Sequence, residues 1–212
     1  MDDLILRYAG EHTSPEPEVL RLLNRETHLK TAWPQMLSGH LQGRILAMIS
    51  KLLKPEAILE IGTFTGYSAL CLAEGLPEHG HLHTIEANPE FEDTIRHWIA
   101  RAGYEEKIHL HVGDAVKLLP GLLARYRFSL AFLDADKQGY PEYYRLLRKG
   151  LPSGAFILAD NVLWDGKVVP ETRHQDPETL GIRIFNQMVS DDPGVEQVIL
   201  PVRDGLSLIR IL

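Results

Sequence analysis

Short runs of apolar and β-branched residues alternate with helix-length segments along most of the chain. Five such runs follow one another, at residues 57–62, 81–86, 107–112, 128–134 and 155–160. Segments of this length between strands form helical crossovers, which join parallel strands. The pattern therefore predicts an α/β protein with a parallel sheet.

Both ends of the chain depart from this alternation. Near the start, Ser14-Pro15 and Ser38 are placed to open two helices whose apolar residues recur at helical spacing, so residues 1–54 are predicted to form a helical cap on a core of residues 55–212. At the other end, the runs 195–202 and 206–212 are separated by only Arg203-Asp204-Gly205. That connection is too short for a crossover, so the last two strands are predicted to form an antiparallel hairpin.

Composition narrows the class of protein. The chain has 212 residues, 44% of them hydrophobic, which suits one globular domain. Its formal charge of −7 gives no general attraction to nucleic acid. Its first residues lack a basic start, and no long apolar run follows, so we expect a cytoplasmic protein without a membrane segment.

The stretch LEIGTFTGYSAL (59–70) joins a predicted strand to a predicted helix, a common place for a nucleotide-like cofactor. A dinucleotide fingerprint starting at Gly62 would need glycines where Phe64 and Tyr67 stand, which disfavours a nicotinamide oxidoreductase. An acid, Glu60, with small residues after it suits S-adenosylmethionine, whose ammonium group needs an acceptor. Glu86, at the end of the next strand, is placed to accept hydrogen bonds from the ribose hydroxyls.

The fourth and fifth strand ends carry oxygen ligands. LDADK (133–137) and ADN (159–161) supply Asp134, Asp160 and Asn161, the hard donors that Mg²⁺ prefers. Two carboxylates and an amide leave about half of an octahedral shell for water and substrate, as a catalytic site requires. Because an ammonium beside a divalent cation is disfavoured, Lys137 is predicted to act as a general base.

These motifs, taken together and in order, resemble the cation-dependent class I O-methyltransferases of the caffeoyl-CoA and catechol type. The resemblance rests on EIGTFTGYS, the Glu86 strand end, GDA (113–115), LDADK with a tyrosine soon after, and DNVLWDGKV. It extends from PQMLSGHLQG near residue 34 to the closing GLSLIRI. It implies a Rossmann-like class I methyltransferase fold, with a seven-stranded, mainly parallel sheet, an antiparallel last strand and helices on both faces.

The resemblance also assigns roles by position in the motifs. It implies that the methyl donor is contacted by Met36, Ser38, Glu60, Gly62, Thr63, Ser68, Glu86, Ala115 and Asp136. It implies that Asp134, Asp160 and Asn161 hold Mg²⁺ or another divalent cation such as Mn²⁺ or Ca²⁺, that Lys137 is the general base, and that Trp164 and Asp165 lie beside the acceptor. No N-terminal counterpart of the family's CoA-contacting residues is found, which argues against a thioester substrate.

The predicted reaction is methyl transfer from S-adenosylmethionine to a hydroxyl of a small vicinal-diol phenol such as catechol or caffeate. Two alternatives stay open: the same chemistry on a hydroxylated tRNA base, and a binding module that uses the fold without catalysis. Similar enzymes are commonly homodimers, so a homodimer is expected. Four histidines, at positions 81, 83, 109 and 111, recur with strand period and are expected to be half-buried or solvated strand residues without a catalytic role.

Overall fold

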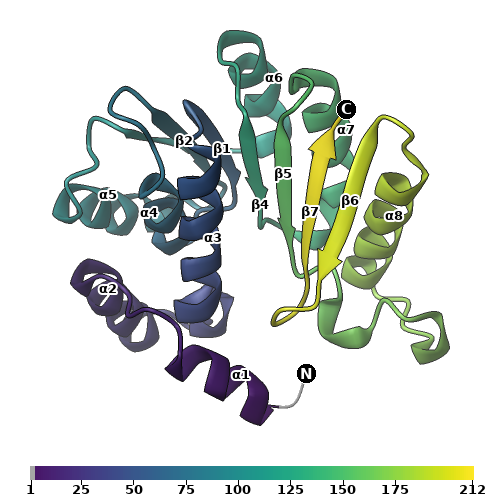
Figure 1. The fold of residues 1–212 in the computed structure, drawn as a ribbon, viewed down its shortest axis with the longest axis horizontal. Coiled ribbons are helices and arrows are strands. Elements are labelled where there is room, and N and C mark those ends of the chain that lie inside the picture. Colours follow the sequence, from purple (N-terminus) through teal and green to yellow (C-terminus); the bar gives the residue numbers. More distant parts are fainter. Residues whose placement is uncertain (1–2) are drawn as a thin grey trace. The chain divides into compact units, whose positions relative to one another are not determined.

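The computed structural model describes residues 3–212, and it divides into two compact units (Figure 1). The first unit comprises Met1–Ile58 and Thr63–Gly113, and the second comprises Leu59–Gly62 and Asp114–Leu212. No helix within residues 3–212 has both the length and the apolar character needed to cross a membrane.

Seven strands are hydrogen-bonded in the order β3-β2-β1-β4-β5-β7-β6. They are β1 (Ala57–Ile61), β2 (His81–Glu86), β3 (Ile108–Val112), β4 (Leu130–Leu133), β5 (Phe156–Asp160), β6 (Val195–Leu200) and β7 (Leu206–Ile211). The pairs β2–β3 and β4–β5 are parallel, whereas β7 is antiparallel to both β5 and β6. The predicted mainly parallel sheet with a closing antiparallel hairpin is confirmed.

The first unit carries the N-terminal helices and the helices that follow β1 and β2. These are α1 (Asp3–Glu11), α2 (Glu18–Lys30), α3 (Gly39–Leu53), α4 (Tyr67–Ala73) and α5 (Glu92–Arg101). Every residue of α4 is buried, including Cys71, which fills the core as a free thiol. Helix α1 was not anticipated. The two predicted N-terminal helices are present, but Ser38 occupies the position before α3 without making the predicted capping hydrogen bond.

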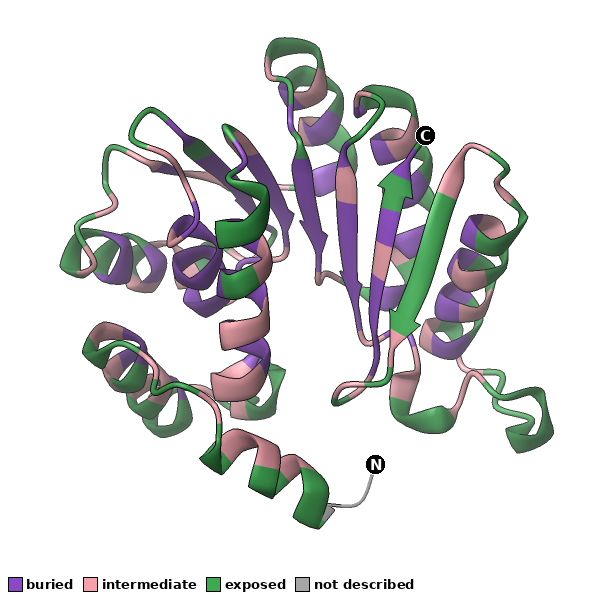
Figure 2. Cartoon of the chain, viewed as in Figure 1, coloured by how far each residue is buried: buried purple, intermediate pink, exposed green. Residues whose placement is uncertain are grey.

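The second unit contains α6 (Ala115–Arg125), α7 (Tyr140–Gly150) and α8 (Pro177–Asp191). All four residues of β4 are buried, as is most of β5, which is typical of strands covered on both faces (Figure 2). Strand β6, at the edge of the sheet, is largely exposed. The hairpin therefore leaves exposed backbone and side chains at the edge of this unit.

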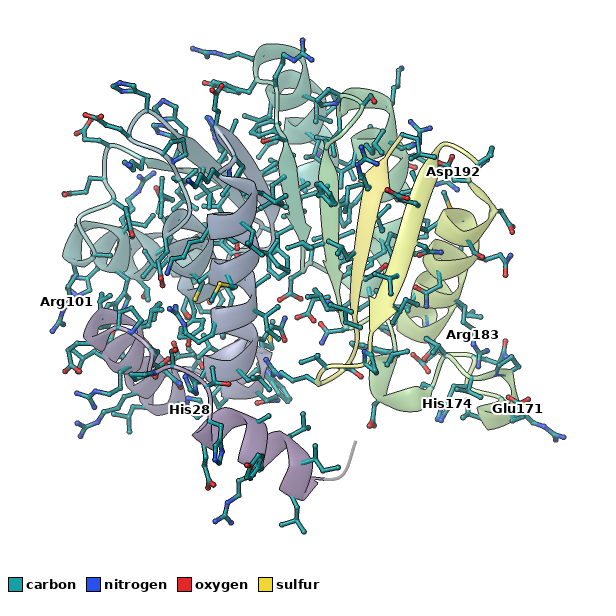
Figure 3. The ribbon with its side chains drawn as sticks, viewed as in Figure 1. His28, Arg101, Glu171, His174, Arg183 and Asp192 are labelled. Carbon is teal, nitrogen blue, oxygen red and sulfur yellow. The ribbon has the colours of Figure 1, made fainter. Side chains whose placement is uncertain are left out.

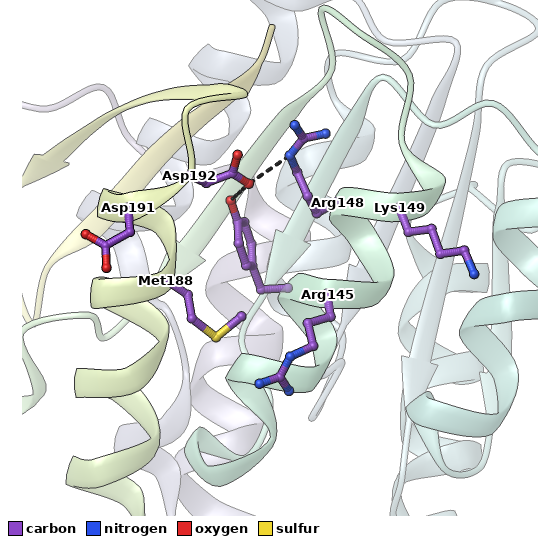
Figure 4. Close-up of a pocket in the computed structure, with 7 residues that line it drawn as sticks. Arg145, Arg148, Lys149, Met188, Asp191 and Asp192 are labelled. Carbon is purple, nitrogen blue, oxygen red and sulfur yellow. Dashed lines mark hydrogen bonds and ion pairs between the residues drawn. The ribbon is translucent and has the colours of Figure 1, made fainter.

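A hollow of about 530 Å³ lies between α7 and α8 (Figure 4). It is lined by Tyr144, Arg145, Arg148, Lys149, Met188, Asp191 and Asp192. The Asp192 carboxylate accepts a hydrogen bond from the Tyr144 hydroxyl and another from Arg148 Nε, with which it also forms an ion pair. Both distances are 2.9 Å. Because Asp192 holds both groups, this network joins the two helices.

Candidate active site

Glu86, at the end of β2, accepts hydrogen bonds from three backbone N–H groups of the first unit. Its Oε2 atom lies 2.7 Å from the Phe64 nitrogen and 3.3 Å from the Thr63 nitrogen, and its Oε1 atom lies 2.8 Å from the Asn88 nitrogen. Phe64 has a positive φ of 54°, which is strained for a bulky residue. The carboxylate therefore fixes the loop after β1 in an uncommon conformation.

Other predicted donor-binding residues of the first unit lie in or beside this loop and at the start of α3. Thr63 and Ser68 are buried, and the Thr63 hydroxyl is hydrogen-bonded to the Thr84 hydroxyl. Ser38 is also buried, whereas Met36 is 58% exposed. Met36 is therefore available to contact a bound molecule.

The second unit holds the remaining predicted donor-binding residues. Glu60 is completely buried in β1, and Ala115 is buried at the start of α6. Asp136 is exposed and caps the turn after β4, with its carboxylate accepting from the Gly139 nitrogen and the Tyr143 hydroxyl. The exposed position leaves this carboxylate open to a ligand.

Gly62 has a structural reason to be glycine. Its φ is +96°, and a Cβ atom there would lie 2.1 Å from the backbone oxygen of Asp134. The sequence interpretation, in which this glycine lets a ligand approach the backbone, is incomplete because the end of β4 already occupies that space. Gly62 thus permits close packing between the segments that follow β1 and β4.

Lys137 is buried and lies between two polar groups of its own unit. Its Nζ atom is 2.9 Å from Asp134 Oδ1 and 2.7 Å from the Tyr140 hydroxyl. The ammonium also lies 4.7 Å from the centre of the Tyr140 ring. A buried lysine held in this way has little rotamer freedom, which suits a group that must meet a proton at a fixed place.

Tyr140 is a residue whose role the sequence did not reveal. It is completely buried, and its hydroxyl lies 3.1 Å from the Leu133 carbonyl oxygen and 2.9 Å from the Asp160 carbonyl oxygen. Burial raises the pKa of this hydroxyl well above its ordinary value, and the negative charges of Asp134 and Asp160 raise it further. Tyr140 therefore stays protonated and joins the ends of β4 and β5 to Lys137. The sequence feature that could have indicated this role is the position of Tyr140, three residues after Lys137.

Asp134 and Asp160 lie at the ends of the same pair of strands, Asp134 directly after β4 and Asp160 as the last residue of β5. Leu133 of β4 is in register with Ala159 of β5, so the two aspartates come next along the ends of paired parallel strands. Asp160 is 4% exposed, and its Oδ1 accepts from the Asn161 backbone nitrogen at 2.8 Å. Within residues 3–212, no group of three or more His, Cys, Asp or Glu side chains is arranged to hold a metal. The predicted ligands Asp134, Asp160 and Asn161 do not form such a group, because the third of them is an amide.

The chemistry of this donor set fits a hard divalent cation. Asp134 and Asp160 bring two carboxylates to the ends of the paired strands β4 and β5. Lys137 is the cation that contacts Asp134 there. A divalent cation with oxygen ligands would offset the remaining negative charge.

The segment after β5 carries Trp164 and Asp165 and is tied to α8 by Arg183 and by Asn186, whose side chain donates to the Val162 carbonyl oxygen at 2.8 Å. Arg183 donates hydrogen bonds to four carbonyl oxygens, those of Lys167, Val168, Val169 and His174, at 2.8 to 3.1 Å. Figure 3 shows Arg183, His174 and Glu171 together at this end of the unit. The indole nitrogen of Trp164 is buried and has no hydrogen-bond partner among the described residues. It is therefore a buried donor that the described residues leave unsatisfied.

Comparison with known families decides the class of protein. The model of the family described as O-methyltransferase matches residues 10–212. The chain belongs to this O-methyltransferase family. Its members transfer a methyl group from S-adenosylmethionine, so this protein is an S-adenosylmethionine-dependent O-methyltransferase.

Curated relatives and solved structures agree with the family. The chain is 35% identical to the catechol O-methyltransferase of Niastella koreensis over 79% of this chain and 78% of the relative. It is also 35% identical to the caffeoyl-CoA O-methyltransferase of Populus kitakamiensis, over 97% and 89%. An O-methyltransferase from Bacillus cereus in complex with SAH has a TM-score of 0.90 and 28% identity, covering 99% of this chain and 97% of that one.

A second solved structure contains the methyl donor itself. It is the O-methyltransferase TomG of Streptomyces achromogenes, involved in tomaymycin synthesis, in complex with SAM. Its TM-score is 0.89 at 30% identity, and the match covers 98% of this chain and 96% of that one. The fold and the donor predicted from the sequence of this O-methyltransferase are thus confirmed.

Proposed function

We propose that this O-methyltransferase transfers the methyl group to a hydroxyl of a small vicinal-diol phenol, such as catechol or caffeate, with a divalent cation bound by Asp134, Asp160 and Asn161. The observation that carries the proposal is the buried Lys137, held by Asp134 and Tyr140 at the strand ends that also carry Asp160. A buried base next to oxygen ligands suits an acceptor that is both chelated and deprotonated.

The first unit supplies donor-binding groups in this proposal. Glu86 has one acceptor position beyond its three backbone bonds, since a carboxylate offers about four lone-pair sites. This position accepts from a ribose hydroxyl. The exposed Met36 and the buried Ser38, Thr63 and Ser68 complete the donor contacts on this side.

The second unit supplies the remaining donor contacts, at Glu60, Gly62, Ala115 and Asp136, and the groups that hold the acceptor. When bound, Mg²⁺ or another divalent cation supplies positive charge that lowers the pKa of an acceptor hydroxyl and favours two adjacent oxygens. Trp164 and the adjacent Asp165 are proposed to lie beside the acceptor, and the buried, unsatisfied indole N–H of Trp164 supports this role.

Lys137 carries the proton transfer. In its neutral amine form, Nζ takes the proton of the acceptor hydroxyl and becomes an ammonium ion, and the oxyanion attacks the sulfonium methyl in line. One C–O bond forms, the S–CH₃ bond breaks, and S-adenosylhomocysteine leaves as a neutral thioether. Tyr140 keeps the lysine aimed and, because its own pKa is raised, does not compete for the proton. Positioning accounts for most of the acceleration.

The substrate class is tested by comparing diols with monophenols. With Mg²⁺ and S-adenosylmethionine, catechol and caffeate are expected to react at least about a hundredfold better in kcat/KM than phenol and p-coumarate, a difference of roughly 2.7 kcal/mol. A monophenol loses the second oxygen, and with it both acidification and alignment. Equal rates would contradict the proposal. Preferential methylation of tRNA in the same assay would identify tRNA, and not a small phenol, as the acceptor.

The metal is tested separately. Chelation is expected to abolish turnover and added Mg²⁺ to restore it, while Asp160→Ala loses activity but keeps its fold. Asp191→Ala, an exposed aspartate of α8, is the matched control and is expected to retain activity. Full activity after exhaustive chelation would refute the role of the cation.

A further inference from the structure

One buried residue of α2 is polar where the pattern of the helix predicts an apolar side chain. The buried residues of α2 are Leu20, Leu23 and Thr27, which recur at helical spacing on one face. Thr27 is 2% exposed, and valine would fill nearly the same space without a hydroxyl. Because a buried hydroxyl without a hydrogen bond destabilises the folded chain, Thr27 requires a partner.

The partner of Thr27 is Thr65, which lies in the loop after β1. The two Oγ1 atoms are 3.0 Å apart, and Thr65 is 1% exposed. Both threonines belong to the first unit, although 38 positions separate them along the chain. The hydroxyl pair thus ties α2 to the loop that carries Thr63 and Phe64.

This loop needs contacts that hold its shape. Thr65 lies between Phe64 and Gly66, whose φ angles are +54° and +96°. A bulky residue in this region persists only where its surroundings fix it. Glu86 of β2 accepts from the Phe64 nitrogen at 2.7 Å, and the next residue, Thr65, is held from α2. Two separate elements therefore fix consecutive residues of the loop.

The backbone of Thr27 also fixes the end of α2. Its carbonyl oxygen accepts from the Thr31 nitrogen at 3.0 Å and from the Thr31 hydroxyl at 2.8 Å. Thr31 ends the helix with an extended backbone, and the chain continues from it to Met36 and Ser38, two of the proposed donor contacts. Thr27 therefore contacts both the loop after β1 and the start of the stretch that leads to these two residues.

We propose that Thr27 is a positioning residue for the methyl donor, whose hydroxyl holds the loop after β1 in the conformation that binds S-adenosylmethionine. The inference rests on the proposed function, because it presupposes that this loop contacts the donor. A ligand that binds only one conformation of a loop binds more weakly when fewer molecules hold that conformation. Loss of the Thr27 hydroxyl should therefore weaken donor binding.

The test compares Thr27→Val with Thr27→Ser in the purified enzyme, with S-adenosylhomocysteine as the probe in calorimetric titration. Valine removes the hydroxyl and leaves that of Thr65 without its partner, whereas serine keeps the bond. Thr27→Val is expected to raise the Kd roughly 3- to 12-fold, the equivalent of one neutral hydrogen bond. Thr27→Ser should bind within about twofold of the wild type, because its hydroxyl still reaches Thr65.

A double variant keeps the test open if Thr27→Val does not fold. Replacing both partners by apolar groups of similar shape is nearly neutral for stability, so Thr27→Val with Thr65→Val should recover the unfolding midpoint. Its Kd should stay raised, because no directional bond replaces the one that is lost. Recovery of the Kd together with the midpoint would show that packing alone positions the loop, which would overturn the inference.

Ser50→Ala is the matched control for general destabilisation. Ser50 is fully buried in the same unit, near the end of α3, and its hydroxyl donates to the Leu72 carbonyl oxygen of α4 at 2.6 Å. The change should lower the unfolding midpoint and leave the Kd for S-adenosylhomocysteine unchanged. An equal rise of the Kd in Ser50→Ala or in Thr27→Ser, or a wild-type Kd in Thr27→Val, would overturn the inference. Failure of the proposed donor contacts looks different, because Glu86→Gln would then bind S-adenosylhomocysteine as tightly as the wild type.

Discussion

Replacing Glu86 with glutamine removes one charge and one acceptor oxygen while keeping the shape of the side chain. In the wild type, Oε2 accepts from the Phe64 and Thr63 nitrogens and Oε1 accepts from the Asn88 nitrogen. A glutamine can keep the pair at Oε2 only by turning its NH₂ toward the Asn88 N–H. Two donors then face each other. The opposite orientation is worse, because it places the NH₂ against two backbone donors.

The magnitude follows from the number of bonds lost. A hydrogen bond to a charged group contributes about 1.5–3 kcal/mol. One such bond, to Asn88, is lost in the free protein, so the free energy of unfolding should fall by that amount. The remaining acceptor position, assigned to one ribose hydroxyl, is also weakened, so the Kd for S-adenosylmethionine should rise roughly 10- to 150-fold, which is the same energy converted at about 1.36 kcal/mol per tenfold. A carboxylate without backbone contacts could accept from both ribose hydroxyls, and its replacement by glutamine would then weaken donor binding further.

Calorimetric titration of the donor and denaturant unfolding measure the two effects independently. Glu90→Gln is the matched control, because it removes the same charge from an exposed side chain four residues away. An unchanged donor Kd with reduced stability would make Glu86 a purely structural residue and refute the ribose assignment. Unchanged stability would refute the argument from backbone bonds.

Three further predictions address the proton-transfer pair, the histidines and the assembly. Tyr140→Phe should lower kcat and reduce the free energy of unfolding by about 1–3 kcal/mol, since it removes the hydroxyl that accepts from Lys137. Lys137→Ala should lower kcat, and this loss should become smaller as pH rises. A loss of kcat that does not depend on pH would contradict the role of Lys137 as a base. Burial lowers the pKa of His109 and His111, with neighbouring histidines adding to the effect and Glu106 opposing it at His109. The unfolded chain therefore binds more protons, so stability should be full above a pH of about 6.5 and fall as pH drops below it, as unfolding midpoints between pH 5 and 8 would show. We propose a homodimer, and the exposed apolar side chains of Val198 and Ile199 in the hairpin are suited to an interface between two copies. A monomer mass in light scattering at micromolar protein would contradict this proposal.

Most of the sheet could be predicted from the sequence because each strand is a short apolar run bounded by polar residues. The run 81–86 coincides with β2, and the hairpin followed from a three-residue connection that no crossover fits. Helix α1 was missed because it is only nine residues long and contains Gly10, a poor helix former, while its apolar residues Leu4, Ile5 and Tyr8 are exposed. Ser38 makes no capping hydrogen bond because its φ and ψ angles are already helical. A capping residue normally has an extended backbone, which directs its side chain toward the N–H groups of the first turn.

The candidate site was predictable where one residue acts at the end of one strand, and not where two distant segments meet. Glu86, Asp134 and Asp160 are strand-end acids and could be chosen from spacing alone. Asp204 lies about forty residues beyond Asp165 along the chain and looks like an ordinary turn residue. Its carboxylate accepts a hydrogen bond from the Asp165 backbone nitrogen, and this contact depends on the register of β7 against β5, which no local pattern encodes.

That register gives a reason for the direction of the last strand. Asp160, the final residue of β5, pairs with Leu206, the first residue of β7. Because β7 is antiparallel, the turn that precedes it lies where β5 ends, beside Asn161. A parallel strand in the same place would begin at the opposite edge and would bring its own end, not a tight turn, to Asn161. The hairpin thus places Asp204 and Gly205 against Val162 and Leu163, so the strand that breaks the parallel order of the sheet also holds the segment carrying the proposed ligand.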